Sequence, residues 1–211
     1  MAASPFDSPL YAQLFDTSEA GRLFSDTATI RAMLLVEGAL AKVQGNLGVI
    51  PELSAAAIHR ATLEVQIDPG ALARPTASNG VPVPGLVAAF REEMKAPEHA
   101  QYAHWGATSQ DIIDTGLMLR LRQALALAEE DIRAIVTSLG QAAEEHAALP
   151  MAARTYGQHA TPTSWGAVLA QFGAPLMDAL AGLDQVRESA LWVSLSGASG
   201  TASALGPKAA E

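Results

Sequence analysis

Apolar residues recur at the spacing of an α-helix along most of the chain, and turns rich in Gly and Pro separate the helical segments. The first helix is predicted over 26–47, where Ile30 and Met33 begin an apolar stripe. Glu37 and Gln44 fall on the same stripe. Because buried polar groups are almost always hydrogen-bonded, we expect both side chains to be buried with polar partners.

Two shorter helices are predicted next, with a loop between them. The first runs over 51–66, and the second runs from Pro84 to about Lys95. The segment between them is rich in residues that interrupt regular structure, namely Pro69, Gly70, Pro75, Asn79, Gly80, Pro82, Pro84 and Gly85. This composition predicts a loop over the whole of 68–85.

The second half of the chain predicts two long helices. Apolar positions stay in helical register over 109–146, which corresponds to a helix roughly 55 Å long at 1.5 Å per residue. Residues 151–161 are expected to be irregular or extended. Thr161 and Pro162 then offer a cap and a first-turn proline for the second long helix. The apolar period resumes beyond Pro175, so we expect a kink there and not an end.

These elements predict an all-α protein. A small helical N-terminal domain is expected over 1–105, and the first part of a central bundle of long antiparallel helices over 106–211. Two long helices do not complete such a bundle, so we expect the bundle to be incomplete in this chain. The glycine- and serine-rich segment 194–203 follows the second long helix and is open to two interpretations, a flexible linker or part of a site.

Composition narrows the possible functions. The 211 residues are 49% hydrophobic and only 5% aromatic, which suits close-packed helices. A net charge of −9 without a dense Lys/Arg run argues against nucleic acid as a partner. The absence of Cys excludes disulfides, thiol catalysis and cysteine-ligated metals. The N-terminal residues lack the features of a signal peptide, and no apolar run looks long enough to span a membrane, so a cytoplasmic protein is expected.

The first polar cluster, 104–115, reads His-Trp-Gly-Ala-Thr-Ser-Gln-Asp-Ile-Ile-Asp-Thr. Thr108 and Ser109 stand where the N-cap of the first long helix belongs. Two hydroxyls beside the free N–H groups of a helix start can bind a carboxylate. His104 is close enough in sequence to deliver a proton to a ligand held there. The alternative is an ordinary N-cap with a histidine in the preceding loop.

The second polar cluster, Arg154-Thr-Tyr-Gly-Gln-His-Ala-Thr-Pro-Thr163, precedes the second long helix. It contains Gln158 and His159, although His159 alone is equally well explained as a structural histidine. In antiparallel helices the two clusters fall at opposite ends, which favours sites formed between the subunits of a symmetric oligomer. A metal site from His99 and His104 has only weak support from their spacing, and neither a serine hydrolase elbow nor a phosphate-binding glycine loop is present.

Together these clusters resemble the signature regions of the fumarase/aspartase superfamily of homotetrameric lyases. The first signature is similar to 104–115 and the second to 154–166. Four shorter segments are most similar to the members of the superfamily that lactonize a carboxylated muconate in protocatechuate breakdown: Ser4-Pro-Phe6, Val81-Pro-Val-Pro84, Gln158-His-Ala-Thr-Pro162 and Ser196-Gly-Ala-Ser-Gly-Thr201. Adenylosuccinate lyase-type β-elimination is the alternative, and a non-catalytic helical oligomer with the same fold is the second.

The resemblance implies a cofactor-independent and metal-free addition to, or elimination across, a double bond next to a carboxylate. It implies a small tricarboxylate substrate and a homotetramer with sites between subunits. It assigns acid–base chemistry to His159, with His104 as the second candidate, and substrate binding to five residues: Thr108, Ser109, Arg154, Gln158 and Thr161. The third family signature, a mobile Gly-Ser-Ser-x-Met-Pro loop expected to carry the general base, has no counterpart here, so this chain alone is expected to be inactive.

Overall fold

The computed structural model describes residues 4–209, and its internal contacts divide the chain into two compact units. Unit 1 contains the residues up to Leu121 together with those from Trp192 onward, and unit 2 is Arg122–Leu191. The long helix α7 (Ser109–Glu145) begins in unit 1 and ends in unit 2. The predicted division between 105 and 106 concerns the domains of a complete bundle and stays a prediction.

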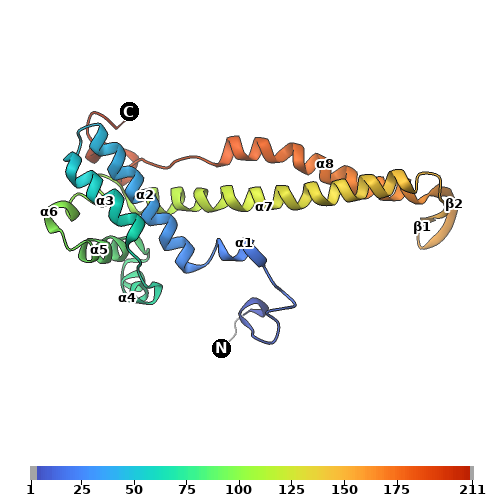
Figure 1. The fold of residues 1–211 in the computed structure, drawn as a ribbon, viewed down its shortest axis with the longest axis horizontal. Helices are drawn as coiled ribbons and strands as arrows, with labels where there is room; N and C mark the ends of the chain where they lie inside the picture. Colours follow the sequence, from blue (N-terminus) through green and yellow to red (C-terminus); the bar gives the residue numbers. More distant parts are fainter. Residues whose placement is uncertain (1–3, 210–211) are drawn as a thin grey trace. The chain divides into compact units, whose positions relative to one another are not determined.

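Unit 1 is built from short and medium helices around one apolar core (Figure 1). The core is centred on α2 (Asp26–Asn46) and α3 (Glu52–Glu64), which pack against each other, and on α5 (Val83–Glu93). Met33, Ile58 and Phe90 are among its largest fully buried side chains. The helices that precede α7 are η1 (Pro5–Asp7), α1 (Ser18–Arg22), α2 (Asp26–Asn46), α3 (Glu52–Glu64), α4 (Pro69–Asn79), α5 (Val83–Glu93) and α6 (Pro97–Ala100). Two single 3-10 turns follow Trp192, η2 (Ala198–Gly200) and η3 (Ser203–Leu205).

The helix α4 corrects the prediction of a loop over 68–85. Asp68 caps its first turn by accepting a hydrogen bond from the N–H of Gly70 at 3.3 Å, and Pro69 occupies the first helical position. Leu72 is buried against the core, and Gly80 ends the helix with φ +76°. Pro69 and Gly80, which indicated a loop, are therefore the start and stop signals of a short helix, and Pro75 lies within it.

Unit 2 contains the rest of α7, a β-hairpin and α8 (Trp165–Ala190). The hairpin joins β1 (Pro150–Thr155) to β2 (Gln158–Ser164) in antiparallel register, with Thr155 paired to Gln158. The two residues between the strands, Tyr156 and Gly157, both have positive φ, as the tight two-residue turn of a hairpin requires. The expectation of extended backbone over 151–161 is confirmed, whereas the pairing of the two strands was not predicted.

The start of α8 also differs from the prediction. Residues 158–164 are paired with β1, so Thr161 and Pro162 lie in a strand and not in the first helical turn. Ser164 is the N-cap, and its hydroxyl accepts a hydrogen bond from the N–H of Ala167 at 3.1 Å. The helix continues through Pro175 to Ala190, as the apolar period predicted.

By length and composition alone, α8 is apolar enough to cross a membrane. The expectation that no segment reaches this threshold is therefore wrong for α8, because the Ala and Leu content that suits a bundle helix also raises its mean hydropathy. The expectation that the protein has no membrane partner stays a prediction.

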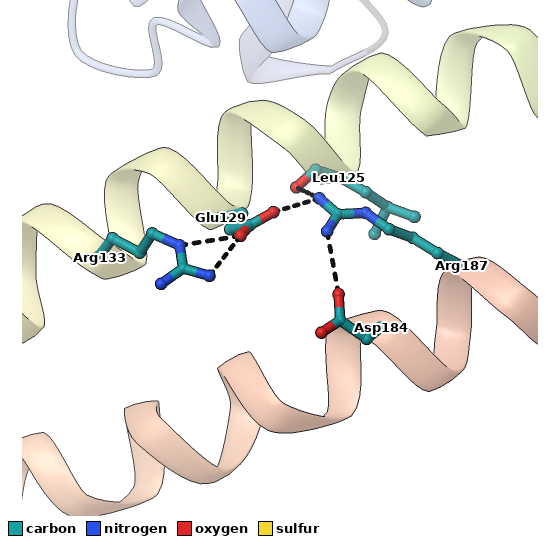
Figure 2. A network of polar contacts seen from close by, with 5 residues as sticks. All are labelled: Leu125, Glu129, Arg133, Asp184 and Arg187. Atoms are coloured by element: carbon teal, nitrogen blue, oxygen red, sulfur yellow. Dashed lines mark hydrogen bonds and ion pairs between the residues drawn. The ribbon is translucent and has the colours of Figure 1, made fainter.

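An ion-pair network joins the two long helices within unit 2 (Figure 2). Glu129 on α7 accepts a hydrogen bond from Nε of Arg133, which lies 2.8 Å from Oε1 of Glu129. Glu129 also accepts a hydrogen bond from Arg187 on α8. Arg187 also approaches Asp184 at 3.4 Å. The hydrogen bond from Arg133, followed by that from Arg187, lowers the pKa of Glu129 below its ordinary value. The same contact with Glu129 raises the pKa of Arg187.

Candidate functional site

The loop that carries His104 is held by hydrogen bonds from side chains of α2 and α5. His104 and Gly106 both have positive φ, +62° and +73°. A left-handed conformation is unfavourable for a histidine, so the surrounding contacts must fix it. Arg91 on α5 donates a hydrogen bond to the Ala103 carbonyl at 2.8 Å, and Gln44 on α2 donates one to the Trp105 carbonyl at 2.7 Å. The carbonyls on both sides of His104 are thus anchored.

His104 itself contacts a buried carboxylate. Its Nδ1 lies 2.6 Å from Oε1 of Glu37, and Glu37 is only 2% exposed. This confirms that Glu37 and Gln44, placed on the apolar stripe by sequence, are buried with polar partners. It also identifies the partners as the two adjacent residues of the loop, which sequence spacing could not do.

The start of α7 is capped by a carboxylate and not by a hydroxyl. Thr108 occupies the predicted cap position, but its N–H donates to Oδ2 of Asp111 at 2.9 Å. Among residues 4–209, the hydroxyls of Thr108 and Ser109 make no hydrogen bond, and neither do the N–H groups of Ser109 and Gln110. The expected carboxylate-binding group therefore loses one backbone donor to Asp111 and keeps two hydroxyls.

Asp111 and Thr115, one turn apart on α7, bind the backbone of the segment that follows α8. Asp111 is 2% exposed; its Oδ1 accepts the Ser196 N–H at 2.9 Å and its Oδ2 accepts the Gly197 N–H at 3.0 Å. Thr115 accepts the Ser194 N–H at 2.9 Å and lies 3.1 Å from the Ser194 carbonyl. Residues 194–197 are thereby fixed beside the first turns of α7, which argues against a flexible linker for this part of the segment.

The second cluster lies in unit 2, on the β-hairpin. Arg154 stands on β1, and Gln158, His159 and Thr161 stand on β2; all four side chains are exposed. Arg154 and His159 occupy paired positions of the two strands. The structure thus gathers the first cluster in unit 1 and the second cluster in unit 2. The prediction that the two meet between subunits remains a prediction.

Sequence reasoning missed two sets of contacts around the first cluster, those of Asp111 and the pairing of Glu37 with His104. Asp111 is the acidic residue three positions after Thr108, the spacing of a capping box, and this signal could have identified it as the cap. Its second role, holding Ser196 and Gly197, depends on residues 85 and 86 positions away and leaves no local signal. The partnership of Glu37 with His104 spans 67 positions and is equally invisible to spacing.

The first cluster combines groups suited to acid–base chemistry on an anionic ligand. It offers an imidazole that contacts a carboxylate, two hydroxyls without a hydrogen-bond partner among the described residues, and the first turn of a long helix. Within residues 4–209, no group of three or more His, Cys, Asp or Glu side chains is placed to hold a metal ion.

Comparisons with known proteins give consistent results. A family model described as lyase matches residues 9–211. The chain is 40% identical to the 3-carboxy-cis,cis-muconate cycloisomerase of Pseudomonas aeruginosa, over 93% of this chain and 44% of that protein. It is 41% identical to the 3-carboxy-cis,cis-muconate cycloisomerase of Pseudomonas putida, over 93% of this chain and 48% of that protein. The crystal structure of the 3-carboxy-cis,cis-muconate lactonizing enzyme from Pseudomonas putida matches with a TM-score of 0.92 and 38% identity, over 96% of this chain and 46% of that chain.

The chain therefore spans about half the length of the relatives it matches. Its mostly helical fold, with the long helices α7 and α8, corresponds to the N-terminal part of the matching lyase structures. This agreement confirms the predicted fold class, with the β-hairpin as its one departure among the described elements.

Proposed function

The chain belongs to the lyase family of the fumarase/aspartase superfamily, and we propose that the complete gene product closes 3-carboxy-cis,cis-muconate to a carboxymuconolactone without a cofactor. The observation that carries this proposal is the similarity to curated cycloisomerases of two Pseudomonas species, at 40% and 41% identity over nearly the whole chain. The arrangement of the first cluster supports it, because the reaction needs an acid–base group beside donors that bind carboxylates.

The proposed reaction is an isomerisation of the acid: for the ionised substrate, ring closure consumes one carboxylate and takes up one proton, which the acid–base residue delivers and solvent then replaces. One substrate carboxylate oxygen forms a C–O bond to a carbon of the diene. The electron pair of that double bond moves toward the carbon next to another carboxylate, and this carbon then receives a proton. Negative charge builds on the second carboxylate before the proton arrives. Donors fixed in advance at that position stabilise such charge, each typically by about 3 kcal/mol.

The residues are assigned as follows. Thr108 and Ser109, whose hydroxyls have no partner among the described residues, bind the carboxylate on which charge develops. His159 transfers the proton or orients the substrate, and His104 is the second candidate for that transfer. The side chains of Arg154, Gln158 and Thr161, exposed on the hairpin, bind the remaining carboxylates. We further propose that the sites form between subunits of a cytoplasmic homotetramer, so that both clusters contribute to one site.

The test is an ultraviolet assay of the complete gene product with 3-carboxy-cis,cis-muconate. Loss of the diene absorbance, with a lactone of unchanged mass as product, is expected. Cleavage of adenylosuccinate with no effect on the muconate would instead assign the protein to the alternative, and inactivity on both would contradict the proposed chemistry.

The role of His159 is tested by His159→Gln in the same gene product. We expect turnover to fall by about 10²- to 10⁴-fold, the usual contribution of a positioned acid–base residue, while the oligomer survives on size-exclusion chromatography. His146→Gln, a histidine outside both clusters, is the matched control. Wild-type turnover in His159→Gln would remove the residue from the site.

A further inference from the structure

We infer that Glu37 is a positioning residue, which fixes the tautomer and orientation of His104 so that Nε2 of this histidine exchanges the proton with the substrate. This inference rests on the proposed function and makes His104 a proton-transfer group in its own right. The juxtaposition that carries it is the 2.6 Å contact between Nδ1 of His104 and Oε1 of Glu37.

The first argument concerns the energetics of the buried carboxylate. Glu37 is 2% exposed, and its second oxygen, Oε2, is buried without a hydrogen-bond partner among residues 4–209. Burying a carboxylate with one oxygen unsatisfied costs free energy, and an apolar residue on this face of α2 would avoid that cost. Stability of the fold therefore does not explain a glutamate at this position, whereas a requirement for an acceptor beside His104 does.

The second argument concerns the histidine. When Nδ1–H donates to the Glu37 carboxylate, the neutral imidazole carries its free electron pair on Nε2. Nε2 has no hydrogen-bond partner among the described residues and is not among their buried unpartnered atoms, so it remains accessible. A carboxylate behind one nitrogen, with the other nitrogen open, is the arrangement that orients a histidine for proton transfer and stabilises its protonated form.

The third argument concerns the backbone. His104 has φ +62°, and the carbonyls of Ala103 and Trp105 are held by Arg91 and Gln44. A glycine at position 104 would adopt this backbone conformation at a lower cost in free energy than a histidine does. The fold thus holds a strained histidine between two anchored carbonyls and against a buried carboxylate. Local strain that is over-determined by its surroundings in this way is typical of functional positions.

The direct test is nitrogen NMR of the complete gene product labelled with ¹⁵N-histidine, with His104→Gln used to assign the signal. We expect neutral His104 in the Nδ1–H tautomer, and we expect Glu37→Gln to lose that single tautomer. Glu93→Gln, the same change at an exposed position of unit 1, is the control and should leave the signal unchanged. Nε2–H as the tautomer in the unsubstituted protein would overturn the inference, even if Glu37→Gln failed to fold.

Kinetics then separate positioning from stability. We expect Glu37→Gln to lower kcat by about 10- to 100-fold with little change in KM, because Glu37 is only 2% exposed and acts through His104. If Glu37 acts through His104, the double variant Glu37→Gln/His104→Gln should be no slower than His104→Gln alone. Multiplication of the two losses would overturn the inference. Should the unsubstituted protein turn over no muconate, the proposed function fails, while the tautomer measurement still decides whether Glu37 positions His104.

Discussion

The carboxylate of Asp111 should be one of the most sensitive positions in unit 1. It is buried and accepts three backbone hydrogen bonds, from Thr108 at 2.9 Å, Ser196 at 2.9 Å and Gly197 at 3.0 Å. Two of these bonds hold a segment that is remote in sequence. Removing the carboxylate therefore releases the cap of α7 and the anchor of residues 196 and 197 together.

The loss can be worked out from these contacts. A hydrogen bond to a charged group is worth about 1.5–3 kcal/mol, but donors that reach water recover part of that value. The N–H of Gly197 makes a buried bond, whereas those of Thr108 and Ser196 are only partly buried. We therefore expect Asp111→Ala to cost about 3–5 kcal/mol. In Asp111→Asn, the amide oxygen can still accept from the N–H groups of Thr108 and Gly197, but the NH₂ group then faces the Ser196 N–H, which is also a donor. We expect this change to lower the free energy of unfolding by about 1–3 kcal/mol.

The assay is thermal unfolding of the complete gene product, combined with amide hydrogen exchange. About 2–4 °C per kcal/mol is typical of 150–250 residues and the shift falls with size, so Asp111→Ala should lower Tm of the longer gene product by several degrees and speed exchange at Ser196 and Gly197. Asp114→Asn is the matched control, since Asp114 lies on the same helix and, among residues 4–209, its carboxylate accepts a hydrogen bond from the side chain of Gln110 alone. It should cost less than about 0.5 kcal/mol. Unchanged Tm and unchanged exchange in Asp111→Ala would refute the reasoning.

Two further substitutions test other contacts. Gly106→Ala should lower the free energy of unfolding by about 1–3 kcal/mol in denaturant titrations, because φ is +73° and a new Cβ would lie 2.7 Å from Leu205 Cδ2. Gly48→Ala is the control and should cost less, since Gly48 has φ +67° but nothing lies within 4 Å of the new Cβ. An equal cost at both positions would contradict the role of the close contact. Glu129→Gln should lower Tm at pH 7, because the two neighbouring arginines lower the pKa of Glu129 and its contribution is therefore present above the ordinary value of 4.5. The difference should vanish as pH falls through that lowered value, and a difference that persists in acid would show that charge is not its cause.

The local pattern predicted the helices better than it predicted their connections. The apolar stripe located α2 and the whole length of α7 to within a residue or two, because apolar residues recur at helical spacing along both segments. The segment 68–85 was misread because Pro69 and Gly80 occur both in loops and at helix ends. The hairpin at Tyr156 and Gly157 was missed because its strands are short and mostly exposed, so they carry no clear alternation of apolar and polar residues.

The candidate site shows a similar limit. Sequence placed His104 and Thr108 near a helix start, and it recognised Glu37 as a buried polar residue. It could not pair Glu37 with His104, or Asp111 with Gly197, because these contacts join elements far apart in the chain. Tertiary packing determines such pairings, and the local sequence does not show which of several polar side chains will contact a given loop.

The bonds from Asp111 to Ser196 and Gly197 also set an order of events during synthesis. The two partners lie 85 and 86 residues further along the chain, so α7 begins to emerge from the ribosome long before they exist. At about 5–20 residues per second, that interval is roughly 4–17 s. Throughout it, the carboxylate of Asp111 has only its own helix to cap. All of unit 2 is made within this interval, and the later residues of unit 1 can be anchored on Asp111 only after it.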